Sequence, residues 1–120
     1  MDLYREQILD HYKNPRNFGH LEGADVMSEE VNMSCGDKIT IEINHDDRIK
    51  EIMFSGEGCA INRASASMLT ELVQGMLIKD VMKLNLDDIQ KLLGTTLTPS
   101  RVKCALLPLE AIQKAIQSVV

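Results

Sequence analysis

Three cysteines are the residues of this sequence whose type and setting could do chemistry: Cys35, Cys59 and Cys104. In a reducing compartment, three cysteines are expected to be thiols and not disulfides. Such thiols serve as small buried side chains, as metal ligands or as nucleophiles. Their number alone does not choose between these roles.

The first cysteine lies in the run Cys35-Gly36-Asp37. Residues i and i+2 of an extended chain point to the same side, and Gly36 allows either a close approach to a metal or a left-handed turn. A thiolate and a carboxylate are both acceptable zinc ligands. The spacing alone favours the plainer alternative, a half-buried cysteine beside a turn aspartate.

The second cysteine follows two glycines in Gly56-Glu57-Gly58-Cys59-Ala60. These glycines predict a tight turn out of a strand that ends near Ser55, with a helix beginning just after Cys59. A thiol near a helix N-terminus is favoured as thiolate by the helix dipole. The alternatives are a plain strand-to-helix corner and a phosphate-binding turn, although no Lys-Ser/Thr pair follows.

The third cysteine, Cys104, is expected about one turn into a helix. The segment Thr98-Pro99-Ser100-Arg101 is typical of a helix start, with Thr98 or Ser100 as the N-cap. Arg101 and Lys103 flank Cys104, and nearby cations favour a thiolate. A cysteine on a helix is otherwise most often a core residue.

The first half of the chain predicts one helix followed by strands. A helical face of Tyr4, Ile8, His11 and Tyr12, with Asp2 as the N-cap, ends at Asn14-Pro15. The alternation of Ile39, Ile41 and Ile43, and that of Ile52 with Phe54, predict a hairpin around a turn at residues 44–47. Val31 and Met33 indicate one more strand, and Met27 and Met33 read as core positions.

The second half predicts only helices. They are expected at residues 61–74 with Gly75 at the end, at 77–84, and at 86–93 between Asn85 and Gly94. In the last helix Pro108 removes the hydrogen bond to the carbonyl of Cys104 and favours a kink. The expected fold is α+β, a single domain over residues 1–120 with a small antiparallel sheet of about three strands and helices packed on one face.

Composition excludes several classes of function. The 120 residues carry a net charge of −5, have no run of lysine or arginine, and include two tyrosines, two phenylalanines and no tryptophan. Neither a nucleic-acid partner nor a membrane partner is expected, since no apolar stretch approaches about eighteen residues. The N-terminus lacks a basic stretch followed by an apolar one, so we expect a cytoplasmic location.

Five segments, taken together, resemble the U-type iron–sulfur cluster assembly proteins, the family of the NifU N-terminal domain, IscU and SufU. The segments are Tyr12-Lys13-Asn14-Pro15-Arg16-Asn17-Phe18-Gly19, Ser34-Cys35-Gly36-Asp37, Gly56-Glu57-Gly58-Cys59-Ala60-Ile61, Ala64-Ser65-Ala66-Ser67-Met68 and Arg101-Val102-Lys103-Cys104-Ala105-Leu106-Leu107. The resemblance covers nearly the whole chain. It implies an α+β domain whose cysteines converge at one exposed end.

The resemblance also implies a metal site and its partners. By position the ligands are Cys35, Asp37, Cys59 and Cys104. They would hold zinc, or alternatively a transient [2Fe–2S] cluster. A pyridoxal-phosphate-dependent cysteine desulfurase would supply sulfur, with Cys35 as the candidate acceptor and Arg101 and Lys103 assisting. Apo iron–sulfur proteins or a downstream scaffold would receive the product.

At three places the sequence departs from the family pattern, and these departures bear on the expected partners and on the subfamily that the chain resembles. Lys103 stands where IscU-type members usually carry a histidine, and Leu97-Thr98-Pro99-Ser100-Arg101 replaces their Leu-Pro-Pro-x-Lys motif, so a matching Hsp70-type chaperone is not expected. The site resembles SufU, yet the insertion usual in SufU between the second and third cysteines is missing. Sulfur relay is the leading hypothesis, a cluster scaffold is the second, and a structural zinc domain is the third.

Overall fold

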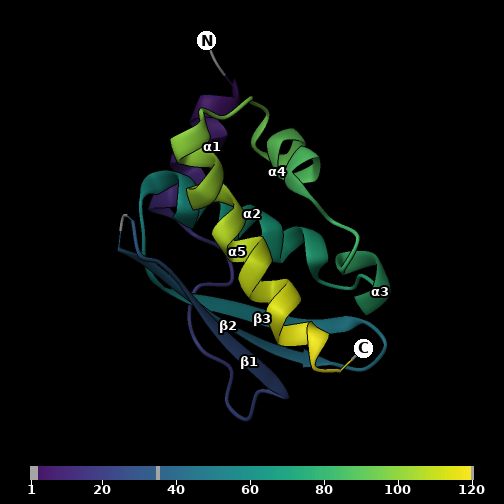
Figure 1. Ribbon diagram of the computed structural model, residues 1–120. Helices are drawn as coiled ribbons and strands as arrows, with labels where there is room; N and C mark the ends of the chain where they lie inside the picture. Colours follow the sequence, from purple (N-terminus) through teal and green to yellow (C-terminus); the bar gives the residue numbers. More distant parts are fainter. Residues whose placement is uncertain (1–2, 35, 120) are drawn as a thin grey trace.

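The chain passes from an N-terminal helix into a three-stranded sheet and then into four more helices (Figure 1). The computed structural model describes residues 3–34 and 36–119, so the expected N-cap Asp2 lies outside the described residues. The elements are, in order, α1 (Leu3–Lys13), β1 (Val26–Asn32), β2 (Asp37–His45), β3 (Ile49–Glu57), α2 (Ala60–Val73), α3 (Ile78–Val81), α4 (Leu86–Leu93) and α5 (Pro99–Gln117).

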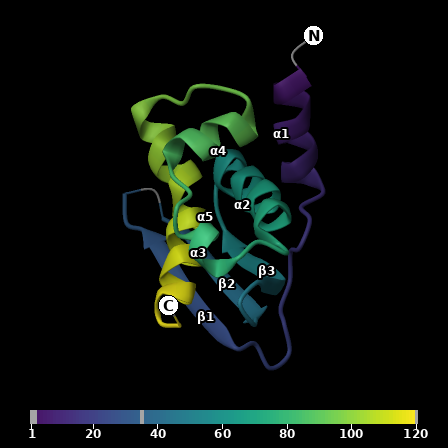
Figure 2. The ribbon, with the colours of Figure 1, turned by 90° about the vertical axis from the view of Figure 1, so that its right-hand side faces the viewer.

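The sheet is antiparallel with the order β1-β2-β3, which confirms the expected strand number and pairing. The alternating isoleucines Ile39, Ile41 and Ile43 are buried, because their face of β2 lies under the helices. Figure 2 shows α2 and α5 packed on this face. The turn between β2 and β3 falls at residues 46–48, slightly later than expected.

β1 begins earlier than the sequence predicted and ends before Met33. Met33 is 89% exposed and Met27 is 65% exposed, so the prediction that they are core residues was wrong. The strand was hard to recognise because its inward positions are polar. Ser28 donates a hydrogen bond to a backbone carbonyl of α5, and Glu30 forms an ion pair with Lys114 of α5 at 3.0 Å.

Local signals fixed the ends of α2 and α4 correctly. Asn85 caps α4 in a capping box with Asp88, and Gly94 ends the helix in the left-handed conformation at φ 74°. Gly75, at φ 86°, follows α2 as expected. These features depend on residues within one turn of each other, which is why the sequence alone predicted them.

α3 is shorter than the helix predicted over residues 77–84. Leu77 forms an isolated β-bridge with Arg48, so the helix begins only at Ile78. Beyond Val81 the chain continues in turns, in which the N–H of Lys83 bonds to the carbonyl of Asp80. A strand contact from the hairpin therefore competes with helix formation at the N-terminal end.

α5 is a continuous helix that crosses the sheet, with Pro108 inside it (Figure 1). Its buried face contacts β1, β2 and α2. The core is formed by aliphatic side chains from all these layers, of which the largest fully buried ones are Ile39, Ile41, Ile43, Ile49, Ile52, Leu69, Ile89, Leu93, Leu109, Ile112, Ile116 and Val73. α5 thus places Cys104 above the same end of the sheet at which β2 begins.

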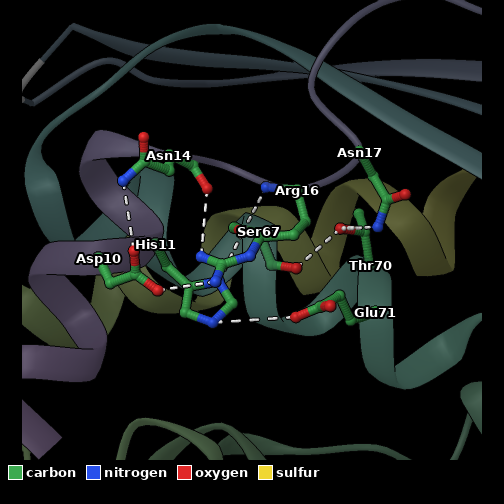
Figure 3. Close-up of polar contacts among 8 residues, drawn as sticks. All are labelled: Asp10, His11, Asn14, Arg16, Asn17, Ser67, Thr70 and Glu71. Atoms are coloured by element: carbon green, nitrogen blue, oxygen red, sulfur yellow. Dashed lines mark hydrogen bonds and ion pairs between the residues drawn. The ribbon is translucent and has the colours of Figure 1, made fainter.

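A polar network docks α1 and the segment after it onto α2 (Figure 3). The Ser67 hydroxyl accepts the backbone N–H of Arg16 at 2.8 Å and lies 2.7 Å from Nδ1 of His11. The other ring nitrogen of His11, Nε2, faces Oε1 of Glu71 at 3.8 Å. His11 is therefore a buried packing residue.

Burial lowers the pKa of His11 below its usual value, and the nearby Arg16 charge lowers it further against the opposing effects of Glu71 and Asp10. The neutral form is thus the one that fits between α1 and α2.

Among residues 3–34 and 36–119, no helix combines the length and the apolar character that a bilayer crossing requires.

Candidate metal centre

Three candidate ligands from distant parts of the chain meet at one end of the fold. One ligand atom from each of Asp37, Cys59 and Cys104 lies within 4.8 Å of the others. Asp37 is the first residue of β2, Cys59 is the N-cap of α2, and Cys104 lies in the second turn of α5. The structure therefore brings together three of the four expected ligands. Cys35, the fourth, lies outside the described residues.

Asp37 is held at the site by the turn between β1 and β2. Gly36 adopts φ 77° and donates its N–H to the carbonyl of Asn32 at 2.8 Å. The left-handed turn, one of the two possibilities stated for Gly36, is thus confirmed. Asp37 is 7% exposed, and its Oδ2 has no hydrogen-bond partner among the residues the structure describes.

Cys59 caps α2 directly, since its Sγ accepts the backbone N–H of Asn62 at 3.5 Å. β3 continues to Glu57, so the prediction that this strand ends near Ser55 was wrong. The strand extends because Gly56, at φ 128°, permits close pairing with β2. A Cβ on Gly56 would overlap the carbonyl oxygen of Lys38.

Cys104 is half-buried on α5, whose N-cap is Thr98 and whose first turn contains Pro99, as predicted. Its Sγ lies 3.8 Å from the carbonyl oxygen of Ser100, one turn earlier. The regular helix start places the thiol toward Asp37 and Cys59, and the residue also packs against the edge of the hydrophobic core.

The two cations expected to assist are exposed and lie on different sides of α5. Arg101 lines a groove on the side of α5 that faces α1. Lys103 lines a shallow depression next to Asn32 and Met33, at the end of β1. Neither belongs to the group of ligand atoms. Their part in the chemistry remains an expectation.

Sequence reasoning missed Asn62, which is 4% exposed beside both cysteines. Its amide nitrogen donates to the carbonyl of Cys104 at 3.3 Å. The available signal was a lone amide among the small and apolar residues of the first turn of α2. Among the other histidines, His20 contacts Glu42 at 3.0 Å, and His45 lies at the end of β2.

The residues present fit a thiophilic metal. Two thiols and one carboxylate are ligands that zinc accepts, and cysteine thiolates also hold iron–sulfur clusters. A buried carboxylate oxygen normally has a partner, so the missing partner of Asp37 Oδ2 among the described residues is the observation expected where a metal binds.

A groove of about 430 Å³ opens beside this group, between α1, the start of α2 and the start of α5. Ala60, next to Cys59, and Arg101 line it together with Tyr4 and Leu9. Leu9 is 41% exposed. The groove is lined by none of Asp37, Cys59 and Cys104, and Cys59 is itself exposed to solvent.

Comparisons with known proteins show which sequences and structures the chain is similar to. The model of the NifU-like N terminal domain matches residues 3–119. The chain is 38% identical to the zinc-dependent sulfurtransferase SufU of Bacillus subtilis, over 95% of this chain and 89% of that protein. It is 37% identical to the iron–sulfur cluster assembly scaffold protein IscU 1 of Archaeoglobus fulgidus, over 95% of this chain and 74% of that one.

A solved structure from Fervidobacterium islandicum, described as an iron–sulfur cluster assembly scaffold protein for the SUF system, superposes with a TM-score of 0.78 at 31% identity, covering 92% of this chain and 94% of that one. Fold, site and sequence together define the U-type iron–sulfur cluster assembly class. The chain belongs to the NifU-like N-terminal domain family.

Proposed function

We propose that this protein accepts sulfur from a cysteine desulfurase at a zinc site formed by Cys35, Asp37, Cys59 and Cys104. The observation that carries the proposal is the meeting of Asp37, Cys59 and Cys104 within 4.8 Å at an accessible end of the fold. The similarity to a zinc-dependent sulfurtransferase supports it. The cytoplasm suits this chemistry because thiols stay reduced there.

In the transfer step, a thiolate of this chain attacks the outer sulfur of a persulfide on the desulfurase. A new S–S bond forms on this chain, the S–S bond on the desulfurase breaks, and the desulfurase leaves as a thiolate. We assign the attack to Cys35. Arg101 and Lys103 provide positive charge near the incoming anionic persulfide.

Zinc, when bound, keeps the cysteine sulfurs deprotonated and couples ligand binding to the folding of the site. Cys59 and Cys104 are held as ligands by regular helix starts, whereas Asp37 supplies a harder oxygen ligand from the sheet. The protein's own contribution is thus to hold the thiolates of the site together at an exposed end of the fold.

The direct test mixes the protein with a pyridoxal-phosphate-dependent desulfurase and free cysteine, and follows added sulfur by mass spectrometry. We expect a gain of one sulfur that is lost in Cys35→Ala. If Cys35→Ala gains sulfur as fast as the parent, the acceptor is another cysteine, and Cys104→Ala is tested next. No gain in the parent would contradict the proposal.

A second candidate function is a scaffold that builds a [2Fe–2S] cluster and passes it to apo iron–sulfur proteins. The mixed ligand set favours it, because one carboxylate among thiolates would leave the cluster labile. The similarity to proteins named as scaffolds supports it as well. Colourless protein with one zinc indicates sulfur relay, whereas a brown product that loads an apo-acceptor after anaerobic reconstitution indicates a scaffold.

A further inference from the structure

One buried residue, Asn62, is hydrogen-bonded to both of the described cysteines, through its backbone N–H to one and through its side-chain amide to the other. The backbone N–H of Asn62 donates to Sγ of Cys59 at 3.5 Å, and its side-chain Nδ2 donates to the backbone carbonyl of Cys104 at 3.3 Å. Cys59 belongs to the start of α2 and Cys104 to α5. Asn62 therefore links two helices at the point where each presents its thiol.

The carbonyl that Asn62 reaches is the one that a regular helix would use four residues later. In α5 that later residue is Pro108, which is buried and has no N–H to donate. The amide of Asn62 thus supplies, from a neighbouring helix, a donor in place of the one that Pro108 lacks. Asn62 of α2 thus compensates for the N–H that Pro108 of α5 lacks, across the interface between the two helices.

The chain before Cys59 is packed against the same amide. A Cβ on Gly58 would come within 2.6 Å of Oδ1 of Asn62. The absence of a side chain at Gly58 lets the backbone that carries Cys59 lie directly on the amide. The backbone of Gly58 and Cys59 is consequently packed against the Asn62 side chain and held by the start of α2.

We propose that Asn62 is a positioning residue that sets the separation of the Cys59 and Cys104 thiols, with Gly58 and Pro108 as the features that let it do so. Asn62 acts through the Sγ of Cys59, the backbone just before it at Gly58 and the backbone carbonyl of Cys104, and is not itself a ligand. The proposal rests on the proposed metal site only for its zinc measurement, because the separation of the two sulfurs can also be measured without metal.

Ser65 provides a matched control. Its hydroxyl donates to the carbonyl of Ala105 at 2.8 Å, so it also joins α2 to α5 through a buried hydrogen bond. It lies one turn farther along α2 and touches neither Cys59 nor Cys104 in any hydrogen bond that the described residues show. Asn62→Ala and Ser65→Ala each remove one such bond.

Zinc affinity is measured for both variants by competition with a chromophoric chelator, alongside urea unfolding of the metal-free proteins. We expect Asn62→Ala to weaken zinc binding about tenfold, a typical effect of losing a residue that orients metal ligands. Ser65→Ala is expected to change it less than about threefold at a similar loss of stability. Equal zinc affinities in the two variants would overturn the proposal.

Pro108→Ala keeps the test decisive if Asn62→Ala folds poorly. Alanine restores an N–H to the helix, so the double variant Asn62→Ala/Pro108→Ala is expected to regain much of the lost stability. Its zinc affinity is expected to stay weak, because the link between α2 and α5 is still missing. A double variant that binds zinc as tightly as the parent would show that Asn62 only satisfies a carbonyl.

The measurement without metal uses a Cys35→Ser background and mixtures of reduced and oxidised glutathione. Forming the Cys59–Cys104 bond releases two protons and transfers two electrons to glutathione disulfide, which leaves as two glutathione thiols. We expect Asn62→Ala to lower the equilibrium constant for this bond about tenfold relative to Ser65→Ala. An unchanged constant rejects the positioning role, whatever the parent does with zinc. If the parent binds no zinc but the equilibrium constant falls as expected in Asn62→Ala, only the proposed metal site is rejected.

Discussion

Asp37 is the residue at which burial and chemistry conflict most directly. A carboxylate that is 7% exposed, with one oxygen lacking a partner among the described residues, is costly to bury. The sheet pairing of Asp37 with Asn32 holds its backbone at the start of β2, beside the two cysteines. A bound cation would remove the conflict.

The variant Asp37→Asn is predicted to separate the cost of burying the Asp37 carboxylate from its contribution to zinc binding. Without metal, the variant should be at least as stable as the parent, by up to about 1 kcal/mol, because the uncharged amide is cheaper to bury. With zinc present, its stabilisation should be clearly smaller than that of the parent. Urea unfolding with and without zinc measures both effects. Equal stabilisation by zinc in parent and variant would exclude Asp37 as a ligand.

Lys103 is predicted to tune sulfur uptake without binding metal. Its side chain is exposed, and zinc in proteins is held by cysteine, histidine and carboxylate groups and not by lysine. Lys103→Ala should keep one zinc per chain while slowing sulfur uptake about fivefold at low salt, and added salt should reduce the difference. Lys103→His should lengthen the half-life of a reconstituted cluster.

Lys91→Ala, in the last turn of α4, is the control for a general loss of positive charge. Loss of zinc from a folded Lys103→Ala protein would contradict the assignment of Asp37 and the three cysteines as the ligands.

At the scale of elements, the docking of α1 on α2 depends on a neutral histidine. The lowered pKa of His11 means that the folded state holds this proton less tightly than the unfolded state. The corresponding stability is present above the ordinary histidine pKa of about 6.5 and is lost as the pH falls below it. His11→Gln should therefore flatten the pH dependence of the unfolding free energy between about pH 7.5 and 5.5.

The variant should also lose about 1 kcal/mol at the higher pH, from the missing contact with Ser67. His45→Gln, at the end of β2, should keep the pH dependence of the parent. If both variants keep it, the docking of α1 does not respond to His11.

The end of β3 is predicted to be intolerant of any side chain at position 56. Gly56→Ala should destabilise the protein by about 2 kcal/mol or more, because a Cβ there meets the backbone of Lys38 and the φ of 128° is strained for alanine. Gly23→Ala is the matched control, with a positive φ but nothing within 4 Å of its Cβ. It should cost only about 1 kcal/mol. Chemical denaturation distinguishes the two, and equal losses would contradict the steric argument.

At the scale of the whole molecule, the candidate site joins the start of β2, the start of α2 and α5. A metal bound there would connect the sheet to both long helices. Zinc at a hundredfold excess over its dissociation constant should stabilise the fold by about 2.7 kcal/mol. For a chain of this size the melting temperature should rise by about 10 °C.

A chelator should reverse this rise, and Cys59→Ala and Cys104→Ala should remove it, each variant being compared with its own metal-free melting temperature. Differential scanning calorimetry provides the comparison. A rise that persists in both variants would place the metal elsewhere in the protein.

The sequence by itself determined the features that depend on near neighbours. The caps of α4, the alternating strands of the hairpin, the helix start just after Cys59 and the helix start before Cys104 all follow from residues within a few positions of each other. The family resemblance then named the ligands. Backbone geometry is local, so these predictions needed no knowledge of packing.

Only the tertiary structure decided the polar contacts between distant segments. Ser28 and Glu30 place β1 against α5, His11 meets Ser67, and Asn62 reaches the carbonyl of Cys104. Nothing in a periodic pattern marks a buried polar residue as one half of a pair, because its partner lies 42 to 84 residues away. Burial makes such pairs obligatory, and only the packing of the elements shows which residues can form them.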